Sequence, residues 1–184
     1  LGARRAVGDP LTNLDVLQPV ATARWGISVP EPLDFLVASV SAPLDRSLYQ
    51  AEKGLKMGEH AVADGGAIVL DAACPDGVGQ RRFEDLLAGA GTGADAVAAI
   101  ERDGYRLGAH KAVRWRRLQD RGVALAVVAP GFPADDAEAA GLTVLPDRRA
   151  GAAWLRDRAP DGPLLVVDDA AHVVPAVRTP EWGA

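Results

Sequence analysis

Apolar runs alternate with amphipathic stretches along most of this chain, and the alternation predicts its fold. Runs rich in Val, Leu, Ile and Ala at 33–40, 67–72, 123–128, 142–145 and 163–168 predict five strands. Apolar positions three and four apart predict helices over 11–25, 48–63, 80–88, 94–103, 109–121, 134–140 and 148–158. Strand runs without a polar face are typical of strands buried on both sides. We therefore expect an α/β fold, a doubly wound, mostly parallel sheet of about five strands with helices on both faces in Rossmann-like layers.

Polar residues with binding chemistry follow the first strand, in the segment from Pro43 to Lys53. Gln50 and Lys53 lie one helical turn apart, and Tyr49 lies four residues before Lys53, so the three side chains can reach one spot. A helix that starts after a buried strand places its first turn at the carboxyl edge of the sheet, where open α/β folds bind ligands. Unpaired N–H groups at that helix start and the Lys53 cation favour a carboxylate or a phosphate. The Gln50 amide and the Tyr49 hydroxyl suit a neighbouring hydroxyl, as in a 2-hydroxy acid or a sugar acid.

The same residues also have a purely structural interpretation. Residues 47–50 form the pattern of a capping box, in which Ser47 is the N-cap and the Gln50 side chain reaches back to it. Lys53 would then be a solvated helix lysine and Tyr49 a half-buried core residue. Gly77 and Gly79 follow the second strand and would form either an anion-binding loop or a simple turn. Spacing alone leaves both interpretations open.

Composition and charge exclude several classes of function. The chain of 184 residues is 48% hydrophobic and 24% charged, which is ordinary for a globular protein, and its net charge of −5 argues against a nucleic-acid or anionic-membrane surface. A single cysteine permits no internal disulfide, and no apolar run approaches the length of a membrane span, so we expect a cytoplasmic protein. The three histidines, His60, His110 and His172, show no metal-ligand spacing, and we expect no metal site on this chain.

Several motifs, in order, resemble the C-terminal domain of the lactate racemase family, the nickel-pincer nucleotide racemases and epimerases. The pattern Pro-x-Asp-x-x-x-Tyr-Gln-x-x-Lys after a strand is the first, with Asp45 as its aspartate. The turn and strand at 65–70, the Cys and Gly-x-Gly loop at 73–79 and the Gly-Ala-His-Lys segment ending in His110 and Lys111 follow. The resemblance extends from about residue 8 to residue 112.

The resemblance implies an isomerase that removes a hydride from the carbon bearing a hydroxyl and returns it to the other face, using a nickel-pincer nucleotide. It implies that Lys53 and Gln50 hold the substrate. We expect Tyr49 to join them, and Asp45, Gly77, Gly79, His110 and Lys111 to lie around them or bind an anion. The catalytic histidines and the cofactor-linking lysine belong to an N-terminal domain whose motifs do not occur here. We therefore expect no catalytic residue on this chain, and no activity without an N-terminal half supplied in cis or in trans.

The resemblance also predicts how the chain is divided. Residues 1–32 would be a junction segment with a helix, belonging to the interdomain region, and residues 33–184 would be the C-terminal, substrate-side domain. One departure concerns the substrate, because the family's Gly-Gly pair before the motif proline is replaced by Val40 and Ser41. A free-standing, non-catalytic α/β module that binds a small carboxylate or phosphate is the alternative, and a homodimer is compatible with both.

Overall fold

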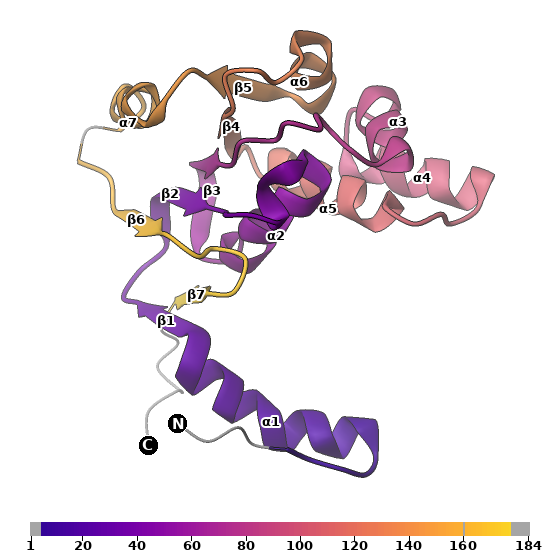
Figure 1. Ribbon diagram of the computed structural model, residues 1–184, viewed down its shortest axis with the longest axis vertical. Coiled ribbons are helices and arrows are strands. Elements are labelled where there is room, and N and C mark those ends of the chain that lie inside the picture. Colours follow the sequence, from indigo (N-terminus) through magenta and orange to yellow (C-terminus); the bar gives the residue numbers. More distant parts are fainter. Residues whose placement is uncertain (1–4, 160, 178–184) are drawn as a thin grey trace.

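A five-stranded parallel sheet forms the centre of the molecule (Figure 1), as seen in a computed structural model that describes residues 5–159 and 161–177. Its strands are β2 (Leu33–Ser39), β3 (Val62–Asp71), β4 (Ala124–Val128), β5 (Leu142–Leu145) and β6 (Leu164–Val167). They lie in the order β5-β4-β3-β2-β6, and every neighbouring pair is parallel. The order reverses between β2 and β6, which makes the sheet doubly wound and confirms the predicted fold class.

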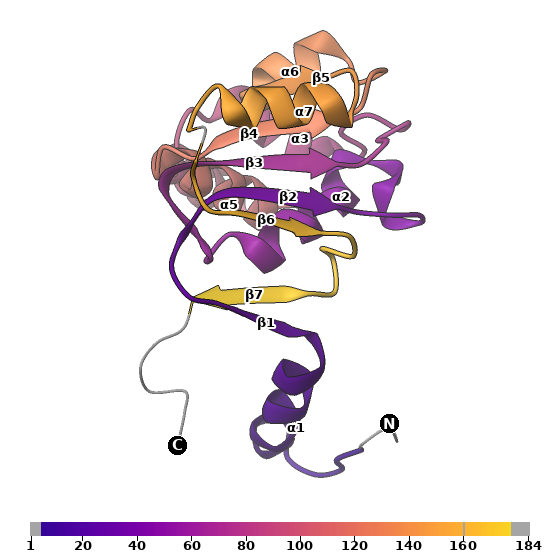
Figure 2. The same cartoon turned by 90° about the vertical axis from the view of Figure 1, so that its left-hand side faces the viewer.

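Helices cover the two faces of this sheet unequally. The helices are α1 (Pro10–Trp25), α2 (Leu48–Gly58), α3 (Arg81–Gly89), α4 (Gly93–Asp103), α5 (Ala109–Asp120), α6 (Ala134–Ala140) and α7 (Arg148–Arg156), with a 3-10 turn η1 (Leu44–Arg46). The larger core joins one face to α2, α3, α5 and α6 and contains Phe83 and Trp115. The smaller core joins the other face to α7 through Phe35, Val69 and Leu155. Figure 2 shows α7 on its own side of the strands.

A second, smaller sheet lies beside the first and was not predicted. It pairs β1 (Gly26–Val29) with β7 (Val174–Val177) in parallel, so that the two ends of the described chain meet (Figure 2). Both strands have four residues, and β7 contains Pro175, which weakens a strand pattern in the sequence. Helix α1 precedes this sheet, projects away from the main body and buries none of its residues. No helix in residues 5–159 and 161–177 is long and apolar enough to cross a membrane.

The boundary between α2 and β3 differs from the prediction, and Val62 belongs to the sheet. We expected the helix to continue to residue 63 and the strand to start at Ala67, but the helix ends at Gly58 and the strand starts at Val62. A Cβ atom at Gly58 would lie 2.3 Å from Leu36 Cδ2, so α2 meets the sheet closely here, and Val62 pairs with Leu33 instead of extending the helix. Gly65, at φ +78°, then lies at the register shift between these strands.

Candidate functional site

The carboxyl edge of β2 leads into α2 through a connection that a second loop holds in place. The Cys74 N–H donates to the Asp45 carbonyl at 2.7 Å, and the Asp76 N–H donates to the Arg46 carbonyl at 2.9 Å. The Arg46 guanidinium also pairs with the Asp76 carboxylate at 2.7 Å. Asp45 therefore contributes its main-chain carbonyl to this connection. Residues 74–79 stabilise the segment that leads into α2.

Two details of the predicted anion site are wrong at the start of α2. The Leu48 and Tyr49 N–H groups donate to the Gly77 and Val78 carbonyls at 3.0 and 3.1 Å, so these groups are not free for a ligand. The loop offers carbonyls to the helix rather than N–H groups to an anion, because the Gly77 N–H already donates to Cys74. Ser47 is the N-cap, as predicted, but its side chain makes no capping bond. A Cβ atom at Gly79 would lie 2.5 Å from Ser47 Cβ, so the loop lies directly against this residue.

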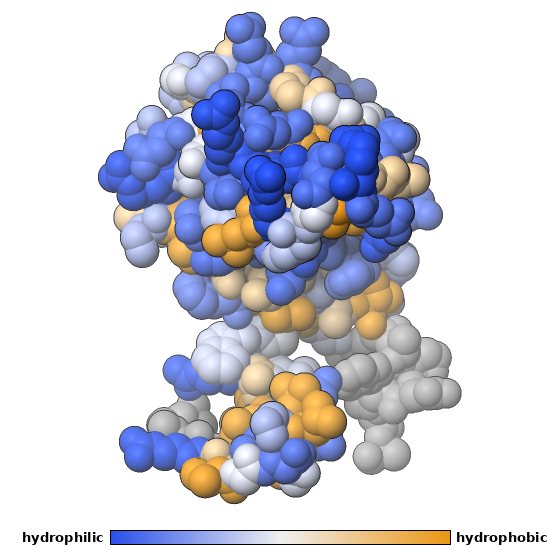
Figure 3. Space-filling model, turned by 90° about the vertical axis from the view of Figure 1, so that its right-hand side faces the viewer, coloured by the Kyte–Doolittle hydropathy of each residue, from blue (hydrophilic) through white to orange (hydrophobic). Residues whose placement is uncertain are grey.

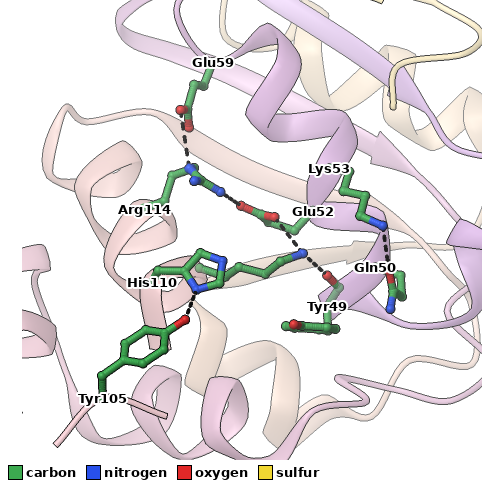
Figure 4. Close-up of polar contacts among 9 residues, drawn as sticks. Tyr49, Gln50, Glu52, Lys53, Glu59, Tyr105, His110 and Arg114 are labelled. Atoms are coloured by element: carbon green, nitrogen blue, oxygen red, sulfur yellow. Dashed lines mark hydrogen bonds and ion pairs between the residues drawn. The ribbon is translucent and has the colours of Figure 1, made fainter. Parts of the chain in front are cut away.

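Gln50 is free of the capping role and lies beside Lys53. The Lys53 Nζ donates to Gln50 Oε1 at 3.0 Å, and both side chains are partly exposed. Figure 4 shows the pair on one side of α2, away from the contacts that join α2 to α5. Neither Lys53 nor Gln50 lines either of the two cavities described below. The structure therefore brings the two predicted substrate ligands together on an open surface.

The Tyr49 ring, the third predicted ligand, lies on the α5 side of the helix. It packs edge-on against Phe83 at 5.9 Å between ring centroids, and the Lys111 ammonium lies 4.2 Å from its centroid. The same ammonium donates to the Tyr49 carbonyl at 2.6 Å. Tyr49 is thus held by the interior of the domain, and Lys111 contacts Tyr49 rather than the exposed pair.

A buried carboxylate, Glu52, joins these groups into a chain of charges. Glu52 lies 3.1 Å from the Lys111 ammonium and 2.8 Å from the Arg114 guanidinium, with its side chain only 2% exposed. The Arg114 guanidinium also lies 3.7 Å from the Glu59 carboxylate (Figure 4). Burial lowers the pKa of Lys111, and the charge of Glu52 opposes that shift. These ion pairs fix α2 against α5 at the level of Tyr49.

Glu52 was missed in the sequence, although a signal for it exists. Leu48, Ala51 and Leu55 are the buried face of α2, and Glu52 lies on that face at the spacing of an apolar position. A carboxylate on a buried face requires a cation, and the basic segment that contains Lys111 and Arg114 is one that could supply it. That basic segment is also not the solvated face that its composition indicates, since Arg116 is buried and donates to main-chain carbonyls.

His110 faces a groove on the far side of Lys111. Its Nδ1 lies 3.0 Å from the Tyr105 hydroxyl, and the two rings are stacked at 6.2 Å. Burial lowers the pKa of His110, and the neighbouring Arg114 and Lys111 charges add to the shift. His110 is therefore in contact with a part of the surface other than that of Lys53 and Gln50.

The two residues in place of the family's glycine pair point in different directions. Val40 is 5% exposed, and a Cβ atom at Gly54 would lie 2.6 Å from its Cγ2, so Val40 fills the space between β2 and α2. Ser41 is exposed at the start of the loop. The departure from the family pattern that reaches the surface is therefore Ser41.

Two of the cavities in the described structure lie on opposite sides of the sheet, one on the α5 side and one on the α7 side. The first, of about 620 Å³, runs along α5 and includes His110. The second, of about 360 Å³, lies between α7 and the exposed side of β2 and β6, with Asp71 and Arg148 at 2.7 Å from each other at its polar end. Among residues 5–159 and 161–177, no group of three His, Cys, Asp or Glu side chains could hold a metal ion.

Comparison with known proteins gives a family match over the part of the chain that carries this site. Residues 31–106 match the family described as the lactate racemase C-terminal domain, a stretch that contains Tyr49, Gln50 and Lys53 but ends before His110. A lactate racemase of Thermoanaerobacterium thermosaccharolyticum is 43% identical over 54 residues, which are 29% of this chain and 13% of that protein.

Solved structures share the fold at low sequence identity. The lactate racemase apoprotein of Thermoanaerobacterium thermosaccharolyticum superposes with a TM-score of 0.75 at 22% identity, over 88% of this chain and 39% of that one. A Thermotoga maritima protein gives a TM-score of 0.62 at 12% identity, over 91% of this chain and 42% of its own. The chain thus spans about two fifths of each solved protein. The segment that holds Lys53 and Gln50 therefore lies within the match to the C-terminal domain family of the lactate racemases.

Proposed function

We propose that this chain is the substrate-binding part of a lactate racemase-like racemase or epimerase of 2-hydroxy acids. The observation that carries the proposal is the Lys53 and Gln50 pair, 3.0 Å apart on the first turns of α2, in a segment that matches the family. Lys53 would bind the substrate carboxylate, and the Gln50 amide would bind the neighbouring hydroxyl. Tyr49, held by Lys111, would fix the position of these helical turns.

The partner in this proposal is an N-terminal catalytic half, in cis or in trans. The family implies a nickel-pincer nucleotide, which would accept and return a hydride, but the described residues offer no donor set for its metal. In this proposal the cofactor and the hydride transfer belong to that other half, and this chain carries out no catalytic step. Helix α1 and the β1–β7 sheet, which lie together at one end of the molecule, would be the connection to it (Figure 1).

The geometry of the Lys53 and Gln50 pair also agrees with a substrate site between two domains. The pair lies in neither cavity, so on this chain alone a ligand would contact one side only. A covering half would exclude water and strengthen the contact between Lys53 and a carboxylate. We propose that the acid lies in the cleft formed when the two halves meet.

Binding of a hydroxy acid to the 184-residue chain tests the role of Lys53. D-lactate and L-lactate would be titrated while amide NMR signals of α2 are followed, because this method detects millimolar dissociation constants. We expect shifts near Gln50 and Lys53 that disappear in Lys53→Ala. Lys56→Ala, which changes an exposed lysine of the same helix, should bind as the unmodified chain does. Equal binding by Lys53→Ala and the unmodified chain would remove the proposed role.

A further inference from the structure

The cavity along α5 has the composition of a ligand site, and the proposed hydroxy acid site does not use it. α5 forms its floor, α4 and Tyr105 form one wall, and the residues that follow α2 form the other. The polar and charged residues that line the cavity are Glu59, His60, Tyr105, His110, Arg114, Arg117 and Arg121. Its volume, about 620 Å³, falls within the range of small-molecule sites. Figure 3 views the molecule from the side where α4 and α5 lie, and hydrophilic side chains dominate it.

Cations exceed anions in this groove although the whole chain is acidic. Arg114, Arg117 and Arg121 recur at helical spacing on one face of α5, and Glu59 is the single carboxylate among the lining residues. A basic groove on a protein with a net charge of −5 concentrates positive potential where a ligand can enter.

Among the arginines of this groove, Arg117 has the guanidinium that is available to a ligand. Arg114 pairs with Glu52 and Glu59, and Arg121 pairs with Asp64 at 2.7 Å and donates to main-chain carbonyls. Arg117 is exposed, and within the described part of the chain its guanidinium makes no hydrogen bond or ion pair. A Cβ atom at Gly93 would lie 2.5 Å from Arg117 Cγ, so the stem of this side chain rests on α4. The guanidinium is thus held at the groove without a protein partner.

An aromatic surface lies at the His110 end of the same groove. Tyr105 is 62% exposed, and its ring is stacked on that of His110. Figure 4 shows the two rings linked through the hydroxyl of Tyr105. Ile100 and Leu118 provide apolar wall between this ring and the arginines. A ligand that spans the groove would therefore meet a flat ring at one end and a guanidinium toward the other.

We propose that this groove binds a nucleoside phosphate, with the base stacked on Tyr105 and the phosphate bound by Arg117. Arginine forms paired hydrogen bonds to phosphate oxygens, and an exposed aromatic ring stacks on a base whatever its identity. A dicarboxylate would use Arg117 but not the ring, and a neutral aromatic compound would use the ring but not Arg117. The nucleoside phosphate uses both, and its binding is independent of Lys53.

Calorimetric titration of the 184-residue chain with AMP, adenosine and inorganic phosphate tests the proposal. We expect AMP to bind more tightly than adenosine or phosphate, and Tyr105→Ala and Arg117→Gln each to weaken AMP binding about tenfold. Both residues are exposed, so neither change should disturb folding, which circular dichroism would verify. Arg149→Gln, at an exposed arginine of α7, is the matched control and should leave the dissociation constant unchanged.

The outcomes separate this site from the hydroxy acid site. AMP binding that survives in Lys53→Ala while it is weakened in Arg117→Gln would support the proposal, whatever the result with lactate. Absence of AMP binding up to about 10 mM, or phosphate binding as tightly as AMP, would overturn it. Equal losses in Arg117→Gln and Arg149→Gln, or loss of AMP binding in Lys53→Ala, would also overturn it.

Discussion

Replacing Lys111 with methionine should destabilise the domain, because it removes the cation of a buried ion pair and leaves the Glu52 carboxylate in place. The Lys111 side chain is 9% exposed and Glu52 is 2% exposed, with 3.1 Å between the ammonium and the carboxylate. Methionine keeps much of the length and the apolar contact of the lysine stem. It removes the partner of Glu52 and the donor to the Tyr49 carbonyl, so the loss is electrostatic rather than a loss of packing.

The size of this loss follows from what remains at Glu52. Removing one partner of a buried pair costs about 3–5 kcal/mol when the other charge is left alone. Arg114 still lies 2.8 Å from the carboxylate, and its side chain is 27% exposed, so part of the charge remains compensated. We therefore expect Lys111→Met to lower the free energy of unfolding by about 2–4 kcal/mol.

Urea unfolding of four chains, followed by circular dichroism, measures this quantity. The chains are the unmodified one, Lys111→Met, Glu52→Gln and the double variant, which together give a double-mutant cycle. The double variant should lose less than the two single variants together, by about 1–3 kcal/mol, because no unpaired carboxylate or ammonium is left. Lys56→Met, at an exposed lysine of α2, should change stability by less than about 0.5 kcal/mol. Additive single effects would refute the pairing of Lys111 with Glu52.

Two further predictions concern the titration of buried groups. Burial raises the pKa of Glu59 above its usual value, so its folded state holds a proton more strongly than the unfolded chain does. Relative to Glu59→Gln, the unmodified chain should lose stability as the pH rises from about 4.5 through the folded pKa of Glu59. Urea unfolding across this range would measure the free energy of unfolding of both chains, and a relative gain in stability with rising pH would contradict the prediction. Burial raises the pKa of the Cys74 thiol to about 12. Iodoacetamide at pH 8 should therefore label native Cys74 very slowly and the urea-unfolded chain readily, and equal rates would contradict its burial.

The layers of the fold could be predicted from the sequence because buried strands and helices have separate periodicities. All five strands of the main sheet and all seven helices lie at or near their predicted positions. The β1–β7 sheet could not be predicted, since it joins two segments of four residues about 150 positions apart, and neither has a strong pattern of its own. The close approach of Gly58 to Leu36, at the end of α2, is likewise a tertiary contact that no local pattern contains.

The proximity of Gln50 and Lys53 could be predicted from the sequence, but the position of Tyr49, which packs against Phe83 and Lys111, could not. The helical spacing of Gln50 and Lys53 correctly placed them side by side. The occupation of the helix start by the Gly77 and Val78 carbonyls depends on how a later loop folds back, which spacing does not encode. The resemblance indicates Lys111 as a candidate site residue. Its contact with the buried Glu52 depends on the packing of α5 on α2, which the sequence does not encode locally.

The exposure of the Lys53 and Gln50 pair limits how tightly this chain alone can bind a carboxylate. A lysine on an open surface gains at most about 1 kcal/mol from an ion pair, because water competes for both charges. Gln50 already accepts a hydrogen bond from Lys53, so a ligand must replace that contact before it gains another. Binding of a hydroxy acid to the isolated chain should therefore be no tighter than millimolar. Tight binding would require a second surface that removes water from the pair, so the proposed covering half would be part of the binding site as well as the source of the chemistry.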